Sequence, residues 1–153
     1  MKIIVQRALS GSVTVDDKQI ATTGKGIVCL VGIHKDDKEE DLDWMVNKIL
    51  KFFCWDADNE TPWRKCVIDI DGDVLLVSQF TLYANLGKGR RPDFSQAMPP
   101  DRAEPMFNRF VEKVRAAYKP EKVQTGQFGA HMQVGIVNDG PVTFTFDSFN
   151  KRG

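Results

Sequence analysis

The sequence lacks an excess of charge of either sign. Lysine and arginine together number 21, as do aspartate and glutamate, so the formal net charge at pH 7 is zero. Proteins that bind nucleic acids without sequence preference usually carry a marked positive excess. The balance therefore argues against a binder that uses its whole surface, and any contact with RNA has to be local.

Long hydrophobic runs are missing too. A membrane-spanning helix needs about 18 or more consecutive apolar residues, and no stretch approaches that length. The first 15 residues alternate as a strand does and carry charge at Lys2 and Arg7, unlike the apolar core of a signal peptide. We therefore expect no membrane association and no secretion.

Cysteine and histidine, which are common in redox and metal sites, are scarce. The three cysteines, Cys29, Cys54 and Cys66, form no Cys-x-x-Cys pair, which favours a reduced, cytoplasmic protein. His34 and His131 lie far apart, without further ligand residues at metal-binding spacing. We expect no metal and no other cofactor, and we interpret His34, which ends an apolar strand, as a structural or surface histidine.

What the sequence does contain is a succession of short strand patterns. They combine β-branched and apolar residues with turn residues between them, and they lie within 2–15, 26–33, 73–84, 131–137 and 141–146. Two helix patterns are inserted singly, without a regular βαβ alternation. This order predicts an α+β fold of one domain over 1–153, a β-barrel-like pair of packed sheets with two outer helices. The tail 148–153 is expected to be loosely held.

The two predicted helices, within 35–53 and 99–118, each show a start signal and an apolar face. Asp36 or Asp37 is the expected N-cap of the first, and Asp101 that of the second, with Glu104 completing a capping box. The residues expected on the two apolar faces are Leu42, Met45, Val46, Ile49, Leu50 and Phe53, and then Met106, Phe107, Phe110, Val111 and Val114.

The segment 85–100 has too many glycine and proline residues for regular structure, and it predicts a functional surface loop. It carries the one local basic cluster, Lys88, Arg90 and Arg91. Such a cluster is commonly just a solvated face. Alternatively, it attracts a phosphate backbone without reading its sequence.

The sequence does not place a hydroxyl nucleophile near a histidine that could act as its base. Ser78 and Thr81 are candidate hydroxyl nucleophiles, but no histidine lies near them in the sequence. Gly140-Pro141 interrupts an otherwise strand-like stretch, GIVNDGPVTFTF. Because proline has no N–H and glycine packs no side chain, the pair marks an edge, a bulge, or a place where another molecule approaches the backbone.

Two motifs together resemble the paired signature of the D-aminoacyl-tRNA deacylases, the D-tyrosyl-tRNA(Tyr) deacylase family. They are SQFTL at 78–82 and NDGPVT at 138–143, and the segments 6–15, 87–104 and 125–144 also look like family segments. The resemblance covers nearly the whole chain. It departs from the family pattern between Thr61 and Gly72, where Trp63 and Cys66 replace a short polar stretch.

The resemblance implies a homodimer that hydrolyses the ester between a D-amino acid and the 3′-terminal adenosine of tRNA, and that also removes mischarged glycine. In the family, a cis Gly-Pro pair from one subunit enters the active site of the other and rejects L-amino acids. The implied residues are Gly140 and Pro141 for this pair, Ser78, Gln79, Phe80 and Thr81 for the catalytic pocket, Ala103, Phe128 and Met132 on the pocket side, and Arg7 bracing the Gly-Pro loop. Lys88, Arg90 and Arg91 are then the expected tRNA contacts.

Alternatives remain open at the level of mechanism. Either Thr81 is a nucleophile, or the 2′-hydroxyl of the tRNA assists water while backbone N–H groups around Phe80 and Thr81 hold the developing oxyanion. The scarcity of imidazoles and metal ligands favours the second version. The sequence does not tell whether the Gly140-Pro141 peptide is cis or trans.

Alternatives remain open at the level of function as well. A non-catalytic dimeric nucleic-acid-binding module would use the basic loop cluster together with Lys151 and Arg152, although the neutral net charge opposes this interpretation. A catalytically inactive relative is a further alternative, against which the two intact motifs argue.

Overall fold

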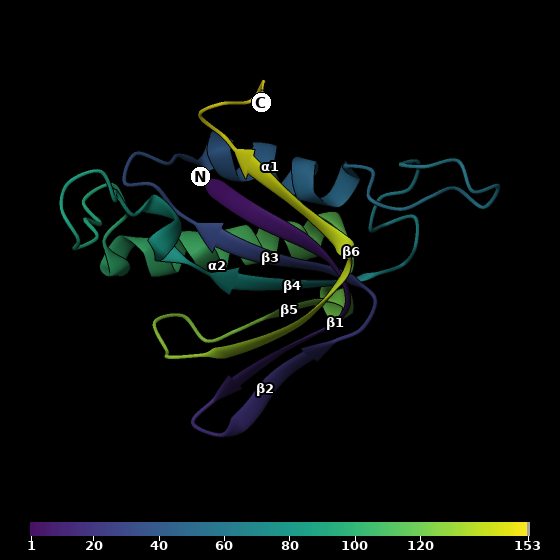
Figure 1. The fold of residues 1–153 in the computed structure, drawn as a ribbon, viewed down its shortest axis with the longest axis horizontal. Helices are drawn as coiled ribbons and strands as arrows, with labels where there is room; N and C mark the ends of the chain where they lie inside the picture. The colour runs from purple at the N-terminus through teal and green to yellow at the C-terminus, as the bar shows by residue number, and fades with distance from the viewer. Residues whose placement is uncertain (153) are drawn as a thin grey trace.

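The computed structural model describes residues 1–152, which form a six-stranded mixed sheet and two α-helices (Figure 1). The strands are β1 (Lys2–Val15), β2 (Lys18–Thr23), β3 (Gly26–Gly32), β4 (Asp73–Ser78), β5 (Val123–Thr125) and β6 (Gln133–Asp147). The helices are α1 (Glu39–Lys51) and α2 (Pro100–Ala117), with short 3₁₀ helices η1 (Phe80–Tyr83) and η2 (Pro120–Lys122).

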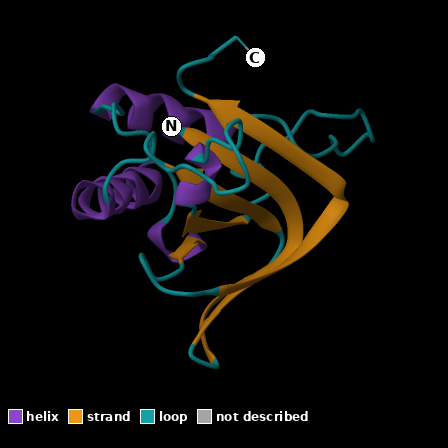
Figure 2. Ribbon diagram, turned by 60° about the vertical axis from the view of Figure 1, so that its left-hand side comes forward, coloured by secondary structure: helices purple, strands orange, loops and turns teal. Residues whose placement is uncertain are grey.

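Strand β1 organises the sheet because it pairs with three other strands. Its first half is antiparallel to β3, its second half is antiparallel to β2, and β6 runs antiparallel along its other side. β3, β4 and β5 continue the sheet in parallel. The sheet curves strongly, with both helices outside it (Figure 2). The predicted α+β, barrel-like fold is confirmed, with the strands forming one curved sheet.

Both helices pack their apolar faces against the sheet. Ten of the eleven side chains predicted on these faces are buried, among them Leu42, Ile49 and Phe110. Burial of one such side chain contributes about 1.5–3 kcal/mol, so the two faces are a main source of stability. The exception is Phe53, which was wrongly predicted: α1 ends at Lys51, Phe52 is already extended, and Phe53 is 51% exposed.

The predicted helix starts are wrong at both helices. α1 has Lys38 at its N-cap, and the Lys38 N–H donates to the Asp41 carboxylate at 2.8 Å. The Asp37 carboxylate instead accepts from the Met1 α-ammonium and from the His34 N–H. α2 begins at Pro100, and Asp101 lies within its first turn. Proline fits this position because its φ is preset and its missing N–H would have no partner there.

Two predicted strand boundaries also changed. The stretch 73–84 is a strand only as far as Ser78 and then turns into η1. The two C-terminal strands form one long strand, β6, which is visibly bent (Figure 1). Apolar residues in a sequence indicate that a segment is buried, but they do not show where its strand ends or whether two such segments form one strand.

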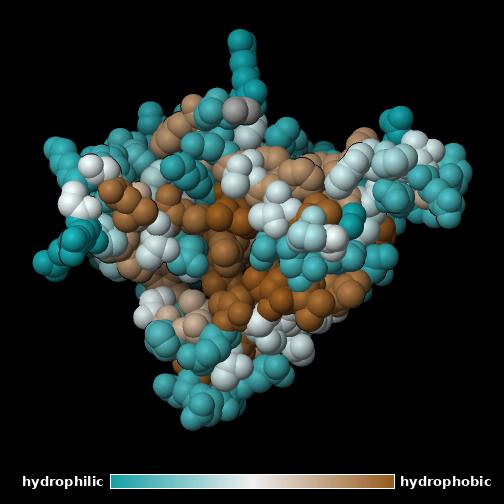
Figure 3. All heavy atoms as spheres, in the orientation of Figure 1, coloured by the Kyte–Doolittle hydropathy of each residue, from teal (hydrophilic) through white to brown (hydrophobic). Residues whose placement is uncertain are grey.

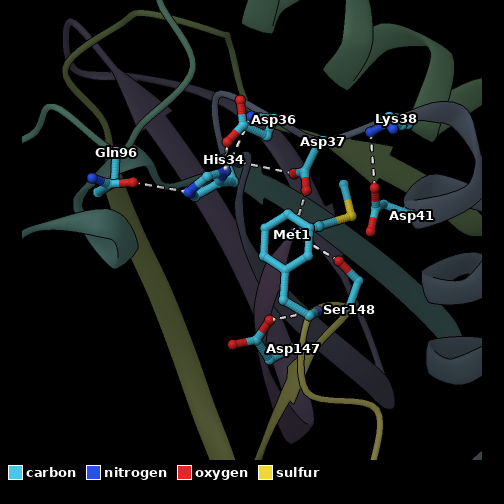
Figure 4. Close-up of polar contacts among 10 residues, drawn as sticks. Met1, His34, Asp36, Asp37, Lys38, Asp41, Gln96, Asp147 and Ser148 are labelled. Atoms are coloured by element: carbon cyan, nitrogen blue, oxygen red, sulfur yellow. Dashed lines mark hydrogen bonds and ion pairs between the residues drawn. The ribbon is translucent and has the colours of Figure 1, made fainter.

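A buried polar cluster joins the start of β1 to the end of β6 (Figure 4). The Met1 α-ammonium lies 2.5 Å from the Asp37 carboxylate and donates to the Ser148 hydroxyl at 2.8 Å. The Ser148 N–H donates to the Met1 carbonyl. Burial raises the pKa of Asp37, although the ammonium favours the charged form. Ser148, the first residue of the expected loose tail, is thus held in place.

Candidate functional site

A cavity of about 740 Å³ opens where β4 ends. It lies between the end of β4, η1, the loop before α2, the first turn of α2 and the segment that precedes β6. Figure 3 shows that hydrophobic side chains line a hollow in one face of the molecule. The polar side chains of the cavity are those of Ser78, Gln79, Ser95 and His131. It therefore suits a ligand with both apolar and hydrogen-bonding groups.

Six of the predicted site residues line this one cavity, although the sequence separates them by up to 54 positions. These are Ser78, Gln79, Phe80, Ala103, Phe128 and Met132. Thr81, Arg7, Gly140, Pro141, Lys88, Arg90 and Arg91 do not line it. The chain therefore brings the predicted pocket together and leaves the Gly-Pro pair elsewhere.

The cavity also contains residues that sequence reasoning missed. The ring of Phe94 meets the ring of Phe80 edge-on at 5.0 Å, and Met98 and Pro99 add further apolar wall. The signal was present in the loop 85–100, where apolar residues interrupt a glycine- and proline-rich stretch. Only the fold reveals that these residues face β4.

The turn from β4 into η1 positions the polar groups of the cavity. β4 pairs with β3 as far as Ser78, and the Gln79 N–H still donates to the Val31 carbonyl at 2.7 Å. The N–H groups of Phe80 and Thr81 have no hydrogen-bond acceptor within residues 1–152. Because they open a helix, these donors are available to an external acceptor.

The hydroxyl of Thr81 is exposed and accepts a hydrogen bond from the Gln79 side chain. Within residues 1–152, no histidine or carboxylate forms a hydrogen bond with it. The His34 ring contacts Gln96 instead (Figure 4). It also packs edge-on against the rings of Tyr83 and Phe149. A side chain that could activate Thr81 by removing its proton is therefore not in place among the described residues.

The Gly-Pro pair lies in an irregularity of the β1–β6 ladder. Gln6 pairs with Thr143 and Ala8 with Asn138, so Arg7 faces the four residues 139–142. The Gly140-Pro141 peptide is cis, and both residues are exposed. Of the three interpretations that the sequence allows, edge, bulge or approach point, the ladder shows a bulge.

Arg7 holds one side of this bulge. Its Nε lies 3.3 Å from an Asp139 carboxylate oxygen and donates to the Asp139 carbonyl at 3.2 Å, while Nη1 donates to the Cys54 carbonyl at 2.8 Å. Cys54 in turn pairs with Lys65, and the Trp63 ring lies 5.9 Å from that of Phe144. The atypical segment 61–72 therefore lies against the strands that carry the bulge.

Asn138 holds the other side, and sequence reasoning missed it. Its side-chain amide donates to the Arg7 carbonyl at 2.8 Å and to the Val142 carbonyl at 3.0 Å. These two bonds span the bulge from β1 to the residue after Pro141. The asparagine stands in the NDGPVT motif, but a motif does not reveal what its amide contacts.

The basic cluster Lys88, Arg90 and Arg91 lies on an exposed loop closed by a bridge between Asn85 and Asp93. Phe94, which lines the cavity, directly follows this bridge. The loop therefore carries positive charge beside the cavity without entering it.

The residues that the structure describes contain neither a reactive cysteine site nor a metal-binding cluster. All three cysteines are buried and free, and burial raises the pKa of Cys54 to about 11. Residues 1–152 contain no group of three or more His, Cys, Asp or Glu residues that could hold a metal. No helix in this range is long and apolar enough to cross a membrane.

Comparisons with known proteins point to one family. The family model described as "D-Tyr-tRNA(Tyr) deacylase" matches residues 4–147. The chain is 47% identical to "D-aminoacyl-tRNA deacylase 1" of Danio rerio, covering 97% of this chain and 71% of the relative. It is 45% identical to "D-aminoacyl-tRNA deacylase" of Thermosipho melanesiensis, covering 97% of each.

Solved structures agree in fold. The chain is similar to one titled "c-Myc DNA Unwinding Element Binding Protein", with a TM-score of 0.93, 45% identity, and coverage of 96% of this chain and 98% of the other. A second, titled "Structural Analysis of a probable eukaryotic D-amino acid tRNA deacylase", has a TM-score of 0.81 at 19% identity, covering 95% of this chain and 97% of the other.

Proposed function

Because the chain belongs to the D-Tyr-tRNA(Tyr) deacylase family and is a hydrolase of the D-aminoacyl-tRNA ester bond, we propose that it works as a homodimer with two composite active sites. In each, the cavity of one subunit holds the aminoacyl end of tRNA. The Gly140-Pro141 pair of the other subunit completes the wall of that site.

One observation carries this proposal: Gly140 and Pro141 are exposed and lie outside the cavity of their own chain. They project from a bulge braced by Arg7 and Asn138, which supports a contact made in a defined position. A second copy of the chain is the partner that such a contact fits, since every copy offers both a cavity and a Gly-Pro pair.

Selectivity then comes from exclusion. Two backbone units with almost no side chain form a wall that leaves no room for the side chain of an L-amino acid. Rejection by clash needs no group that recognises the amino acid itself. Glycine has no side chain to reject, so glycyl-tRNA is also expected to be hydrolysed.

For the hydrolysis we propose that the 2′-hydroxyl of the terminal adenosine assists an attacking water. The unpaired N–H groups of Phe80 and Thr81 are suited to hold the carbonyl oxygen as its negative charge develops, which is commonly a large contribution to acyl transfer. The hydrogen bond from Gln79 to the Thr81 hydroxyl, and the lack of a base at that hydroxyl among the described residues, argue against Thr81 as the nucleophile. Its replacement by alanine should therefore retain most of the activity.

The test of the activity is ester loss from D-Tyr-, L-Tyr- and Gly-charged tRNA. We expect rapid loss from the D-Tyr and Gly esters and little from the L-Tyr ester. Equal rates on the D and L esters would contradict exclusion by Gly140-Pro141.

The composite site is tested by mixing two variants. A Gly140→Ala subunit keeps its cavity but should hydrolyse L-Tyr-tRNA, since a Cβ there would lie 2.7 Å from Val142 Cγ2 and displace the wall. A Phe80→Ala subunit keeps its Gly-Pro pair but has a damaged cavity. When Phe80→Ala is in excess, most Gly140→Ala subunits pair with a Phe80→Ala subunit, which supplies an intact Gly-Pro pair to the one intact cavity. Hydrolysis of the L ester should then be suppressed, and the rate on the D ester per intact cavity should not change. An unchanged L ester rate would show that each chain uses its own pair.

We further propose that the protein acts in the cytoplasm, where the tRNA is and where its three free cysteines stay reduced.

A second candidate function is nucleic-acid binding without catalysis. It is favoured by the likeness to the structure titled as a DNA unwinding element binding protein and by the basic loop. A salt-dependent affinity for duplex DNA equal to that for tRNA, with no ester hydrolysis, would support it.

A further inference from the structure

A second hollow, which we call the basic groove, lies where the two ends of the chain meet α1. Its volume is about 780 Å³. It is lined by the start of β1, Trp44 and Lys48 of α1, Leu82 of η1, and residues 145–147 and 150–152. Nothing in the proposed composite site uses it.

Four cations line the basic groove, namely Lys2, Lys48, Lys151 and Arg152. Within residues 1–152 no carboxylate forms an ion pair with any of them. Many other cations are paired: Arg109 and Lys113 of α2, for example, contact Glu39 at 2.6 and 3.3 Å. The one carboxylate in the groove, that of Asp147, accepts the Phe149 N–H at 2.9 Å. The groove therefore has an uncompensated positive charge in a chain of zero net charge.

Aromatic rings contact three of these four cations. Lys48 Nζ and Lys151 Nζ lie 5.8 and 5.6 Å from the centre of the Trp44 ring, and Lys2 Nζ lies 4.9 Å from that of Tyr83. A cation held over a ring face gains about 0.5–1 kcal/mol at an exposed site. The ammonium groups are thus gathered around one hollow instead of spreading into solvent, which suits a ligand with several negative charges.

The basic groove and the cavity share η1. Phe80, at its start, lines the cavity, and Leu82, two residues on, lines the groove. A 3₁₀ helix rises about 2 Å per residue, so only a few ångströms of chain separate the two. A nucleic-acid strand that ends in the cavity can therefore cross η1 and enter the groove within a few nucleotides.

We propose that the basic groove binds the phosphates of the tRNA acceptor end, upstream of the adenosine that carries the amino acid. The proposal rests on the proposed function, because it takes the 3′ end to lie in the cavity. Phosphate contacts of this kind add salt-dependent affinity and fix the position of the strand without reading its sequence.

The test compares two variants that remove the same kinds of charge. The groove variant combines Lys48→Gln, Lys151→Gln and Arg152→Gln. The control combines Lys18→Gln, Lys25→Gln and Arg64→Gln, three exposed cations without an ion pair within residues 1–152. Affinity for uncharged tRNA is measured at several salt concentrations, together with kcat/KM on D-Tyr-tRNA and on D-tyrosyl-adenosine, which has no phosphates.

For the groove variant we expect tRNA affinity about tenfold or more below that of the control, and a log-log salt slope shallower by about 2–3. The kcat/KM on D-Tyr-tRNA should fall in parallel, whereas that on D-tyrosyl-adenosine should not change. Equal effects of the two variants on tRNA affinity would overturn the proposal. An equal loss of kcat/KM on both esters would also overturn it. So would a groove variant that sediments as a smaller species but binds tRNA as tightly as the control, since the groove would then be a protein interface.

Failure of the proposed function gives a different result. Wild-type protein would then hydrolyse neither ester, while the tRNA affinities of the two variants would still decide whether the groove binds RNA.

Discussion

Asn138 shows how one side chain can hold a functional feature of the backbone. The ladder between β1 and β6 loses its register opposite Arg7, so carbonyl groups there lack their usual strand partners. The Asn138 amide supplies both of its N–H donors to two of these carbonyls, those of Arg7 and Val142. The side chain therefore replaces part of the missing ladder.

Replacing Asn138 by aspartate should weaken both stability and selectivity. A carboxylate cannot donate to the two carbonyls and would face them with like partial charge, at a cost of about 1–3 kcal/mol. We expect a lower midpoint in urea and a smaller ratio of D-Tyr- to L-Tyr-tRNA hydrolysis. Asn47→Asp, on the exposed side of α1, is the matched control. An unchanged ratio in a destabilised variant would mean that Asn138 is structural only.

The cysteines give a second prediction at the residue scale. Desolvation raises the pKa of Cys54 to about 11 and that of Cys29 further still, and Cys66 is shifted in the same direction. Because only the thiolate reacts, iodoacetamide at pH 8 should leave the native protein almost unmodified. Mass spectrometry should then find all three sites alkylated in urea. Rapid modification of the native protein would contradict this.

At the scale of elements, the start of α1 depends on a carboxylate that sequence reasoning did not select. Asp41 accepts from the Lys38 N–H. Its partial burial raises its pKa, but this hydrogen bond and nearby positive charge outweigh burial, so the pKa of Asp41 lies below its ordinary value. The contribution of Asp41 is therefore present above the pKa of the unfolded chain and is lost as the pH falls through the folded-state pKa.

Asp41→Ala should thus lower the free energy of unfolding by about 1 kcal/mol at pH 7. The difference from wild type should shrink as the pH is lowered below about 4. Glu40→Ala is the control: it removes a carboxylate from the same first turn and should cost less. Urea titrations at several pH values measure both, and a difference that stays constant down to pH 2 would rule out the ionic cap.

At the scale of the molecule, the buried cluster around Ser148 ties the start of β1 to the end of β6. Its hydroxyl accepts from the Met1 α-ammonium, and its N–H donates to the Met1 carbonyl. β1 and β6 are the longest strands and pair along most of their length. The cluster therefore extends the pairing of β1 with β6 beyond its last pair, Lys2 with Asp147.

Ser148→Ala leaves the buried ammonium with one partner fewer, and we expect it to lower the free energy of unfolding by about 1–3 kcal/mol. Ser10→Ala, on β1, is the matched control, because the Ser10 hydroxyl has no hydrogen-bond partner within residues 1–152. Thermal or urea unfolding measures the difference. Equal stability of the two variants would mean that the cluster contributes nothing to closure.

The fold class, most of the two helix faces and part of the cavity lining could be predicted from the sequence. Apolar periodicity reports which side of a helix is buried, so residues such as Ile49 and Phe110 could be assigned. The two motifs are short, contiguous segments of the chain. The family resemblance that they support implied six residues that line one cavity. The helix faces follow from residue type and spacing along the chain, whereas the pocket residues were implied by the family resemblance.

Tertiary structure alone decided what depends on contacts between distant segments. Asp37 does not cap α1 because its carboxylate contacts the Met1 ammonium. The role of Asn138 depends on the register of β6 against β1. The basic groove needs Lys2 of β1, Lys48 of α1 and Lys151 of the segment after β6 to converge. No pattern along the chain predicts these contacts, because they arise only when the fold brings the start of β1 and the segment after β6 beside α1.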